Sequence, residues 1–351
     1  MTEHIPKYIK VKNKIKEDIK SGKIVDKLPG ERVLAKNFNV SYMTVRKALM
    51  ELQEEGILHR STTKGTFVSH SKMSPKATKN IGFFLDDKIS EGISSPYYSL
   101  IFKALKKAAK DKGYNILLYS DSDDMNPLND QKKIDGCIIC CFPRIEYKIQ
   151  ELKKFIPIVL LDNIASDKAI PSVTIDNFNS VFNSTKYLAS LGHERIGFIS
   201  GLMDSDICKE RLHGYLSALN NNNLHVDKSL VYKGNYSYES GEKAAMYFLS
   251  LKTPPTAILC ANDSMAIGAM KVVQELGFSI PKDISVMGFD DIEVASRVFP
   301  TLTTNAAPIK DIVQKSLDIL ISTINGHEID YQHIILPAKL VLRDSCSNIK
   351  K

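Results

Sequence analysis

The chain has 351 residues, of which 43% are hydrophobic and 25% are charged, enough for two or three compact units. Its charge is uneven: residues 1–79 carry 17 Lys and Arg against 8 Asp and Glu, a net +9, whereas the other 272 residues carry 30 against 32. No apolar run approaches the roughly 18 residues of a membrane span, and the N-terminus has no apolar signal core. The sequence therefore predicts a cytoplasmic protein with no membrane partner and a basic segment typical of nucleic-acid binding.

The basic segment has the pattern of a winged helix-turn-helix. Apolar residues at helical spacing predict a helix over 8–20 and a short helix over 31–38. Ser41 is a good N-cap for the next helix, which ends near residue 55, and a hairpin over 57–68 follows as the wing. The inward face of that third helix is expected to consist of Val45, Ala48, Leu49 and Leu52.

The third helix is expected to lie in the major groove of DNA. Arg46 faces outward, and arginine can bond bidentately to guanine O6 and N7, so Arg46 is the expected base-reading residue. Ser41 and Thr44 at the helix N-terminus suit a phosphate. The full predicted DNA-binding set is Arg32, Ser41, Tyr42, Thr44, Arg46, Lys47, Thr62, Lys64 and Gly65. For each residue taken alone, a capping or surface role is at least an equal alternative.

The stretch LPGERVLAKNFNVSYMTVRKALMELQEEGIL, followed by KGTFV, resembles the GntR family of winged-helix regulators over residues 6–68. The resemblance implies that Arg32, Thr44 and Arg46 contact DNA and that the wing enters the minor groove. One position departs from the family pattern, because Tyr42 stands where an arginine commonly follows the serine. The operator sequence therefore does not carry over from relatives.

From residue 80 onward, short apolar strands alternate with amphipathic helices. Strands are predicted at 81–85, 115–119, 136–142, 157–162, 172–175, 195–200, 256–261 and 284–290. Continuous apolar strands separated by helices indicate parallel sheets covered on both faces. Eight of them exceed one small sheet, so the fold class is α/β with two doubly wound lobes. The expected domains are a DNA-binding domain over 1–70, a linker over 71–79, and an effector-binding and dimerisation domain over 80–351.

The six cysteines do not form a recognisable metal site. Cys137 and Cys140 have Cys-x-x-Cys spacing, but neither a second pair nor a nearby histidine completes a zinc site. A strand would also point these two side chains to opposite faces. Reduced, buried cysteines are therefore expected, and no metal or cofactor.

Polar side chains follow the apolar strands where each strand ends. Asp162 closes one strand, Asn262 and Asp263 follow another, and Asp290 and Asp291 follow a third. Ligands of open α/β sheets bind at the carboxyl ends of the strands. Carboxylate and amide groups with aromatic rings suit a polyhydroxyl ligand, although a single carboxylate more often caps a helix. The candidate rings are Tyr97, Tyr98, Phe142 and Tyr236.

A succession of motifs over residues 80–346 resembles the LacI/GalR effector domain, among them IPSVTIDNFNS, LASLGHERIGFISG, PTAILCANDSMAIGAMKVV and IPKDISVMGFDDIEVASRVFPTLTT. The resemblance implies two periplasmic-binding-protein-like lobes, a ligand in the cleft between them, and a homodimer. The effector-binding residues it implies, together with the candidate rings, are Tyr98, Phe142, Asp162, Arg211, Tyr236, Asn262 and Asp290. The segment 120–135 is about two helical turns shorter than the family pattern.

A GntR-type head on this body is the arrangement of arabinose-operon repressors. The sequence thus predicts a non-enzymatic repressor of carbohydrate genes that a sugar releases from operator DNA, with L-arabinose as the candidate sugar. A solute-binding protein is the first alternative, but it would lack the basic head and need an export signal. A sugar-dependent activator is the second. An enzyme is disfavoured because the chain has no G-x-S-x-G, P-loop or HExxH motif.

Overall fold

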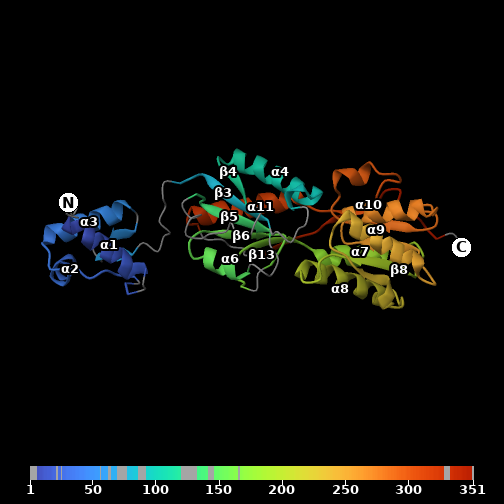
Figure 1. Ribbon diagram of the computed structural model, residues 1–351, viewed down its shortest axis with the longest axis horizontal. Coiled ribbons are helices and arrows are strands. Elements are labelled where there is room, and N and C mark those ends of the chain that lie inside the picture. Colours follow the sequence, from blue (N-terminus) through green and yellow to red (C-terminus); the bar gives the residue numbers. More distant parts are fainter. Residues whose placement is uncertain are drawn as a thin grey trace, which may run out of the picture. The chain divides into compact units, whose positions relative to one another are not determined.

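The computed structural model describes residues 6–20, 23–24, 26–55, 57–61, 65–68, 77–85, 92–119, 133–140, 146–164, 167–327 and 333–349. The chain divides into two compact units, Met1–Thr78 and Lys79–Lys351, both drawn in Figure 1. Most of the short segment at 120–135 lies outside the described residues. Within the described ranges, no helix is long and apolar enough to cross a membrane.

The first unit is the predicted winged helix-turn-helix. Its elements are α1 (Lys7–Lys20), α2 (Glu31–Asn37), α3 (Tyr42–Glu54), β1 (Leu58–Ser61) and β2 (Gly65–Val68). Ser41 caps α3 as predicted, because its Oγ accepts a hydrogen bond from the Thr44 amide at 3.2 Å. The two strands pair antiparallel as a hairpin. All four residues predicted to face inward from α3 are buried in the core of the unit.

One lobe of the second unit is built on a six-stranded parallel sheet with the order β13-β7-β6-β5-β3-β4. The strands are β3 (Asn80–Leu85), β4 (Asn115–Tyr119), β5 (Gly136–Cys140), β6 (Ile158–Leu161), β7 (Ser172–Ile175) and β13 (His333–Leu336). Five of them match predicted strands. β13 was not predicted, because it is only four residues long and none of them is buried.

Helices cover both faces of this sheet (Figure 1). α4 (Pro96–Asp111) and α11 (Ile309–Ile324) pack together on one face, and α6 (Glu146–Leu152) packs on the other. Cys140 belongs to the first of these two cores and Cys137 to the second, so the side chains point to opposite faces as predicted. Among the described residues, no three metal-binding side chains gather in one place.

The other lobe has a four-stranded parallel sheet with the order β11-β10-β8-β9. Its strands are β8 (Ile196–Ser200), β9 (Val231–Lys233), β10 (Ala257–Cys260) and β11 (Ser285–Met287). Its helices are α7 (Asn177–Ser190), α8 (Asp206–Asn221), α9 (Tyr238–Ser250) and α10 (Asp263–Glu275). Phe198 of β8 stacks on Tyr215 of α8, whereas the neighbouring Gly197 lies against Phe248 of α9, so the two helix pairs cover opposite faces. The lobe is doubly wound, as predicted. Short 3-10 turns occur at Lys228–Leu230 and Glu293–Ser296 in this lobe and at Gly92–Ser94, before α4, in the first lobe.

The chain passes between the lobes after β7, after β12 (Thr304–Ala306) and after β13. β12 pairs antiparallel with β14 (Lys339–Val341), and neither of these three-residue strands was predicted. The Asp176 amide donates to the Leu336 carbonyl oxygen at 2.8 Å, so the first and last connections lie side by side. Neighbouring segments of the chain therefore join the two lobes.

Two glycines allow α9 and α10 to approach closely. A Cβ added at Gly241 would lie 2.0 Å from the Met265 carbonyl oxygen, and one added at Gly268 would lie 2.1 Å from the Tyr238 carbonyl oxygen. Both contacts are with backbone atoms inside a close-packed interior, which has no spare room. Because Asn262 caps α10, this helix packing also sets the position of one side of the cleft.

Candidate DNA-reading surface and effector cleft

The outer face of α3 carries much of the predicted DNA-binding set. Arg46 and Lys47 are exposed there, and so are the large apolar side chains of Tyr42, Met43 and Met50. A cluster of exposed apolar side chains of this kind marks a surface that meets a partner. In a major groove, such a face can meet base edges through Arg46 and thymine methyl groups through the apolar side chains.

Several of the other predicted head residues also make contacts within the protein. Ser41 Oγ lies 2.8 Å from Thr44 Oγ1 and accepts from the Thr44 amide, so the capping role of Ser41 is present in the fold. Lys47 Nζ lies 4.1 Å from the centroid of the Tyr8 ring, a cation–π contact that joins α3 to α1. Arg32 is exposed at the start of α2. Both basic side chains thus lie on the surface of the head.

The wing and the recognition helix supply the remaining residues of the set. A hydrogen bond with Glu31 raises the pKa of Tyr42, so this tyrosine is tied to α2 although its ring is exposed. Gly65 begins β2 with φ of +111°, a conformation that favours glycine. The backbone of the turn is therefore enough to account for a glycine at this position. Thr62 and Lys64 lie outside the described residues.

A cleft that is partly open to solvent lies where strand ends of both lobes meet. Every described member of the predicted effector set lines it, namely Tyr98, Asp162, Arg211, Tyr236, Asn262 and Asp290. Phe142 lies outside the described residues. Lining residues that the prediction missed are Ser95, Leu202, Ser205, Ile207, Asn235 and Ser237. Three of these are serine N-caps of α4, α8 and α9, so the serine before each helix that follows a strand was the signal that could have found them.

Arg211 lies at the floor of the cleft and is 3% exposed. Its Nε donates to Asn177 Oδ1 at 2.8 Å, and its Nη1 donates to the Ala261 carbonyl oxygen. The guanidinium carbon lies 3.8 Å from the centroid of the Phe289 ring. These contacts hold the plane of the guanidinium in one orientation, which pre-organises it for a ligand.

Two buried aspartates face this arginine across the cavity. The Tyr97 hydroxyl donates to Asp162 Oδ2 at 2.9 Å, and Asp162 Oδ1 is buried without a hydrogen bond of normal geometry among the described residues. Burial raises the pKa of Asp162, and the nearby Arg211 only partly offsets it. Burial likewise raises the pKa of Asp290 well above its usual range, against the opposing charge of Arg211. Each carboxyl group therefore has unused hydrogen-bonding capacity for a ligand hydroxyl.

Aromatic and amide groups complete the cleft. The Tyr236 ring lies directly over Gly201, where an added Cβ would fall 1.9 Å from the ring, and Tyr97 and Tyr98 meet edge to face at 5.2 Å between centroids. Asn262 is already engaged, because its Oδ1 caps the Met265 amide and its Nδ2 donates to the Tyr236 carbonyl oxygen at 2.9 Å. Rings beside polar groups form a site that can cover the CH face of a sugar while bonding its hydroxyls.

Comparison with known proteins identifies both parts of the chain. Residues 7–68 match the bacterial regulatory proteins of the gntR family, and residues 185–346 match the periplasmic binding protein-like domain. The arabinose metabolism transcriptional repressor of Geobacillus stearothermophilus is 30% identical over 98% of this chain and 99% of its own length. Catabolite control protein A of Priestia megaterium is 31% identical over 90% of this chain and 93% of its own. Among solved structures, the transcription regulator CcpA of Lactococcus lactis covers 76% of this chain and 98% of its own at 26% identity, with a TM-score of 0.67.

The chain belongs to the bacterial transcriptional repressors that join a gntR-type head to a periplasmic-binding-protein-like body. Its relatives are transcriptional regulators rather than enzymes, which agrees with the prediction from sequence. In this repressor the head is the unit with the basic excess and the exposed α3 face. The body is the unit that contains the cleft.

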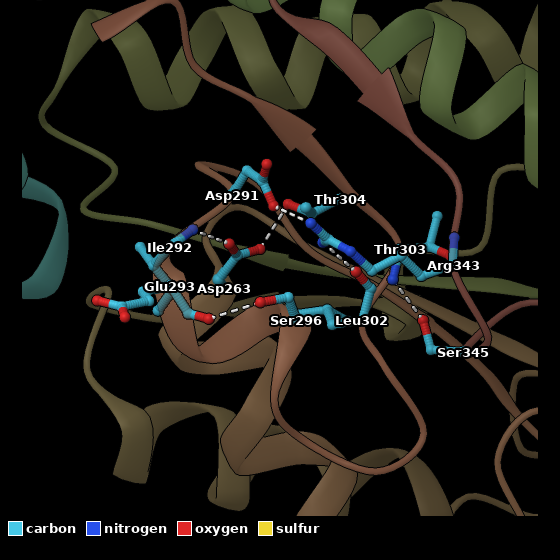
Figure 2. Close-up of polar contacts among 10 residues, drawn as sticks. All are labelled: Asp263, Asp291, Ile292, Glu293, Ser296, Leu302, Thr303, Thr304, Arg343 and Ser345. Carbon is cyan, nitrogen blue, oxygen red and sulfur yellow. Dashed lines mark hydrogen bonds and ion pairs between the residues drawn. The ribbon is translucent and has the colours of Figure 1, made fainter.

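One acidic residue beside the repressor's cleft has a structural role instead (Figure 2). Asp263 is fully buried, its Oδ2 accepts from the Ile292 amide at 2.9 Å, and its Oδ1 lies 2.6 Å from the Thr304 hydroxyl. Gly288 makes room for it, since an added Cβ there would lie 2.1 Å from Asp263 Oδ1. Burial raises the pKa of Asp263 to about 7, although hydrogen bonds from Thr304 and Ile292 oppose the rise.

We expect the stability of the repressor to fall as pH rises from about 4 to about 7. The unfolded chain releases the Asp263 proton near pH 4, whereas the folded chain keeps it until about pH 7. Between these pH values the folded state binds more protons than the unfolded state, so the free energy of unfolding decreases as pH rises. The full effect is up to about 4 kcal/mol for this one group. Urea unfolding of the body, followed by circular dichroism at pH 5 and pH 8, measures it.

Asp263→Asn is the control for this pH dependence. Its amide can accept from Ile292 and, with the Thr304 hydroxyl rotated to act as acceptor, donate to Thr304, but it does not titrate. The difference in unfolding free energy between pH 5 and pH 8 should therefore shrink in this variant. An unchanged difference would show that other carboxyl groups carry the pH dependence.

Proposed function

We propose that this repressor holds operator DNA as a homodimer in the cytoplasm and leaves it when a small uncharged sugar binds in the cleft. The observation that carries the proposal is the buried set formed by Arg211, Asp162 and Asp290 between two lobes, with tyrosine rings beside it. A ligand that touches both lobes favours the closed cleft and can shift the protein by its differential affinity for the two states. The change in operator affinity is typically about 5- to 150-fold.

The charge of the cleft supports a neutral ligand. Two carboxyl groups face one guanidinium, and burial has already raised the pKa of both Asp162 and Asp290. An anionic ligand would raise these pKa values further, so its binding would require proton uptake. L-arabinose is the first sugar to test, because a relative that spans nearly the whole chain is named for arabinose metabolism.

The body offers an apolar surface that supports dimerisation. Phe299 is 88% exposed, and its carbonyl oxygen accepts from Gln274 near the end of α10, where Leu276 and Phe278 are also exposed. Burial of such side chains against a second copy would remove apolar area from water. Two heads related by a two-fold axis would then read a near-palindromic operator. Sedimentation of the full chain tests this, and a monomer at micromolar concentration would contradict it.

The decisive experiment combines operator release with ligand binding. DNA selected from a random library by the full chain supplies the operator, and fluorescence anisotropy then measures its affinity with and without each sugar of a panel. The panel contains L-arabinose, D-xylose, D-ribose, D-glucose, glucose 6-phosphate and glucuronate. We expect a neutral sugar to lower operator affinity and the two anions to have no effect. If no sugar of the panel binds the protein, or if none lowers its affinity for the operator, the proposed function is wrong.

For DNA reading, we propose that Arg46 contacts a base edge, that Arg32 and Thr44 contact the backbone, and that the wing enters the minor groove. Arg46→Ala should weaken binding to the preferred operator by about 10- to 100-fold and flatten the ranking of variants at one base step. Lys64→Ala should instead weaken all sequences alike and reduce the salt dependence. If Arg46→Ala ranked the operator variants in the same order as the natural chain, Arg46 would not read a base and would at most contact a phosphate.

A further inference from the structure

The turn that carries Asp290 has an unusual backbone. Asp290 has φ of +110° and the next residue, Asp291, has φ of +58°, both in the region that favours glycine. Side chains held in this region persist only where the surrounding structure fixes them. The position of the Asp290 carboxylate in the cleft therefore depends on what supports residues 290–292.

Arg343 provides a support outside the cleft (Figure 2). Its Nη2 donates to Asp291 Oδ1 at 2.6 Å, and its Nη1 donates to the Leu302 carbonyl oxygen at 2.8 Å. Its own backbone amide donates to Thr303 Oγ1 at 3.0 Å. The side chain is 18% exposed and does not line the cavity. One guanidinium thus joins the Asp290–Asp291 turn to residues 302–303.

Residues 302–303 lead directly into β12, which passes on to the other lobe. The Asp290 amide donates to the Asn305 carbonyl oxygen of β12 at 2.8 Å, and the Ala307 amide donates to the Asp290 carbonyl oxygen at 3.3 Å. Both backbone groups of Asp290 are therefore bonded to the connection between the lobes. Arg343 holds Asp291 against the start of that same segment.

We infer that Arg343 is a positioning residue for effector binding, which acts through Asp291 to keep the Asp290 carboxylate directed into the cleft. The inference rests on the proposed function, because it concerns affinity for the same ligand. Without the ion pair, Asp291 would relax from its left-handed conformation and carry Asp290 with it. Sugar affinity would then fall although no residue of the cavity lining had changed.

A double-mutant cycle on sugar affinity tests the inference. Arg343→Gln, Asp291→Asn and the double variant are titrated by calorimetry with L-arabinose or, if it does not bind, with the panel sugar that binds the natural chain. Each single variant should weaken binding about tenfold, and the double variant should be within twofold of either single one, because both remove the same interaction. Arg343→Lys, which keeps the charge, should recover part of the loss.

Arg297→Gln is the matched control. Arg297 pairs with Glu293 in the neighbouring 3-10 turn and is largely exposed, so its loss should leave sugar affinity unchanged. Sugar-free operator binding and the melting temperature show that each variant is folded. The inference would be wrong if Arg343→Gln bound the sugar as tightly as the natural chain, or if the two single losses added to a hundredfold loss of sugar affinity in the double variant. Either result would leave the proposed function intact. A natural chain that binds no panel sugar would overturn both.

Discussion

Asp290→Asn and Arg211→Ala should each abolish release of the operator by sugar while leaving sugar-free operator affinity within about twofold of the natural chain. Asp290 and Arg211 are buried groups of opposite formal charge in the cleft, and truncating one partner of such a pair typically costs about 2–5 kcal/mol of binding, which is about 30- to several thousand-fold in affinity. The head is a separate compact unit, Met1–Thr78, so its DNA-reading face is not altered directly. Operator titration with and without the sugar measures both effects.

Asp290→Asn is the sharper of the two variants. Asparagine tolerates positive φ at least as well as aspartate, so the turn can keep its backbone while the carboxyl group is lost. Arg211→Ala also leaves Asn177 without its Nε partner and uncovers Phe289, so its melting temperature must be compared. Lys209→Ala, an exposed position on α8, is the control and should respond to sugar normally. A retained response in both cleft variants would place the effector elsewhere.

Gly241→Ala and Gly268→Ala should unfold the body or destabilise it by several kcal/mol. The new Cβ would lie 2.0 Å and 2.1 Å, respectively, from a carbonyl oxygen of the facing helix, far inside van der Waals contact. Overpacking of a well-packed core by a methyl group costs about 1–3 kcal/mol, and a clash with backbone costs more because a helix cannot repack as a side chain can. Thermal unfolding followed by circular dichroism measures the loss.

Lys243→Ala controls for substitution on the same helix. Lys243 is exposed on α9, so alanine there should change stability by less than about 0.5 kcal/mol. In the full chain, the head, which has its own core, should unfold at the same temperature whichever body variant is made. If Gly241→Ala melted at the same temperature as the natural chain, α9 and α10 could move apart without loss of stability. That result would contradict the close packing of the two helices.

Local pattern was enough to predict much of this repressor from its sequence. The winged helix-turn-helix follows from helical spacing, the Ser41 cap and the basic excess, all of which are short-range features. The eight predicted strands match strands of the two sheets because buried parallel strands are continuous apolar runs. Asp162 and Asp290 were found because a polar residue directly after such a strand lies at the ligand-binding edge of a sheet.

Only the tertiary structure decided how residues distant in the sequence are combined. β12, β13 and β14 are three or four residues long and are defined by partners that are distant in the sequence, β14 for β12 and β7 for β13, so no local period marks them. Asp263 and Asp290 both follow apolar strands, yet the first is enclosed by Ile292 and Thr304 while the second lines the cleft. Arg343 lies 52 residues from its partner Asp291, and that contact exists only because the chain returns between the lobes. Sequence pattern reports periodicity and strand ends, whereas the pairing of buried polar groups depends on which chain segments the fold places side by side.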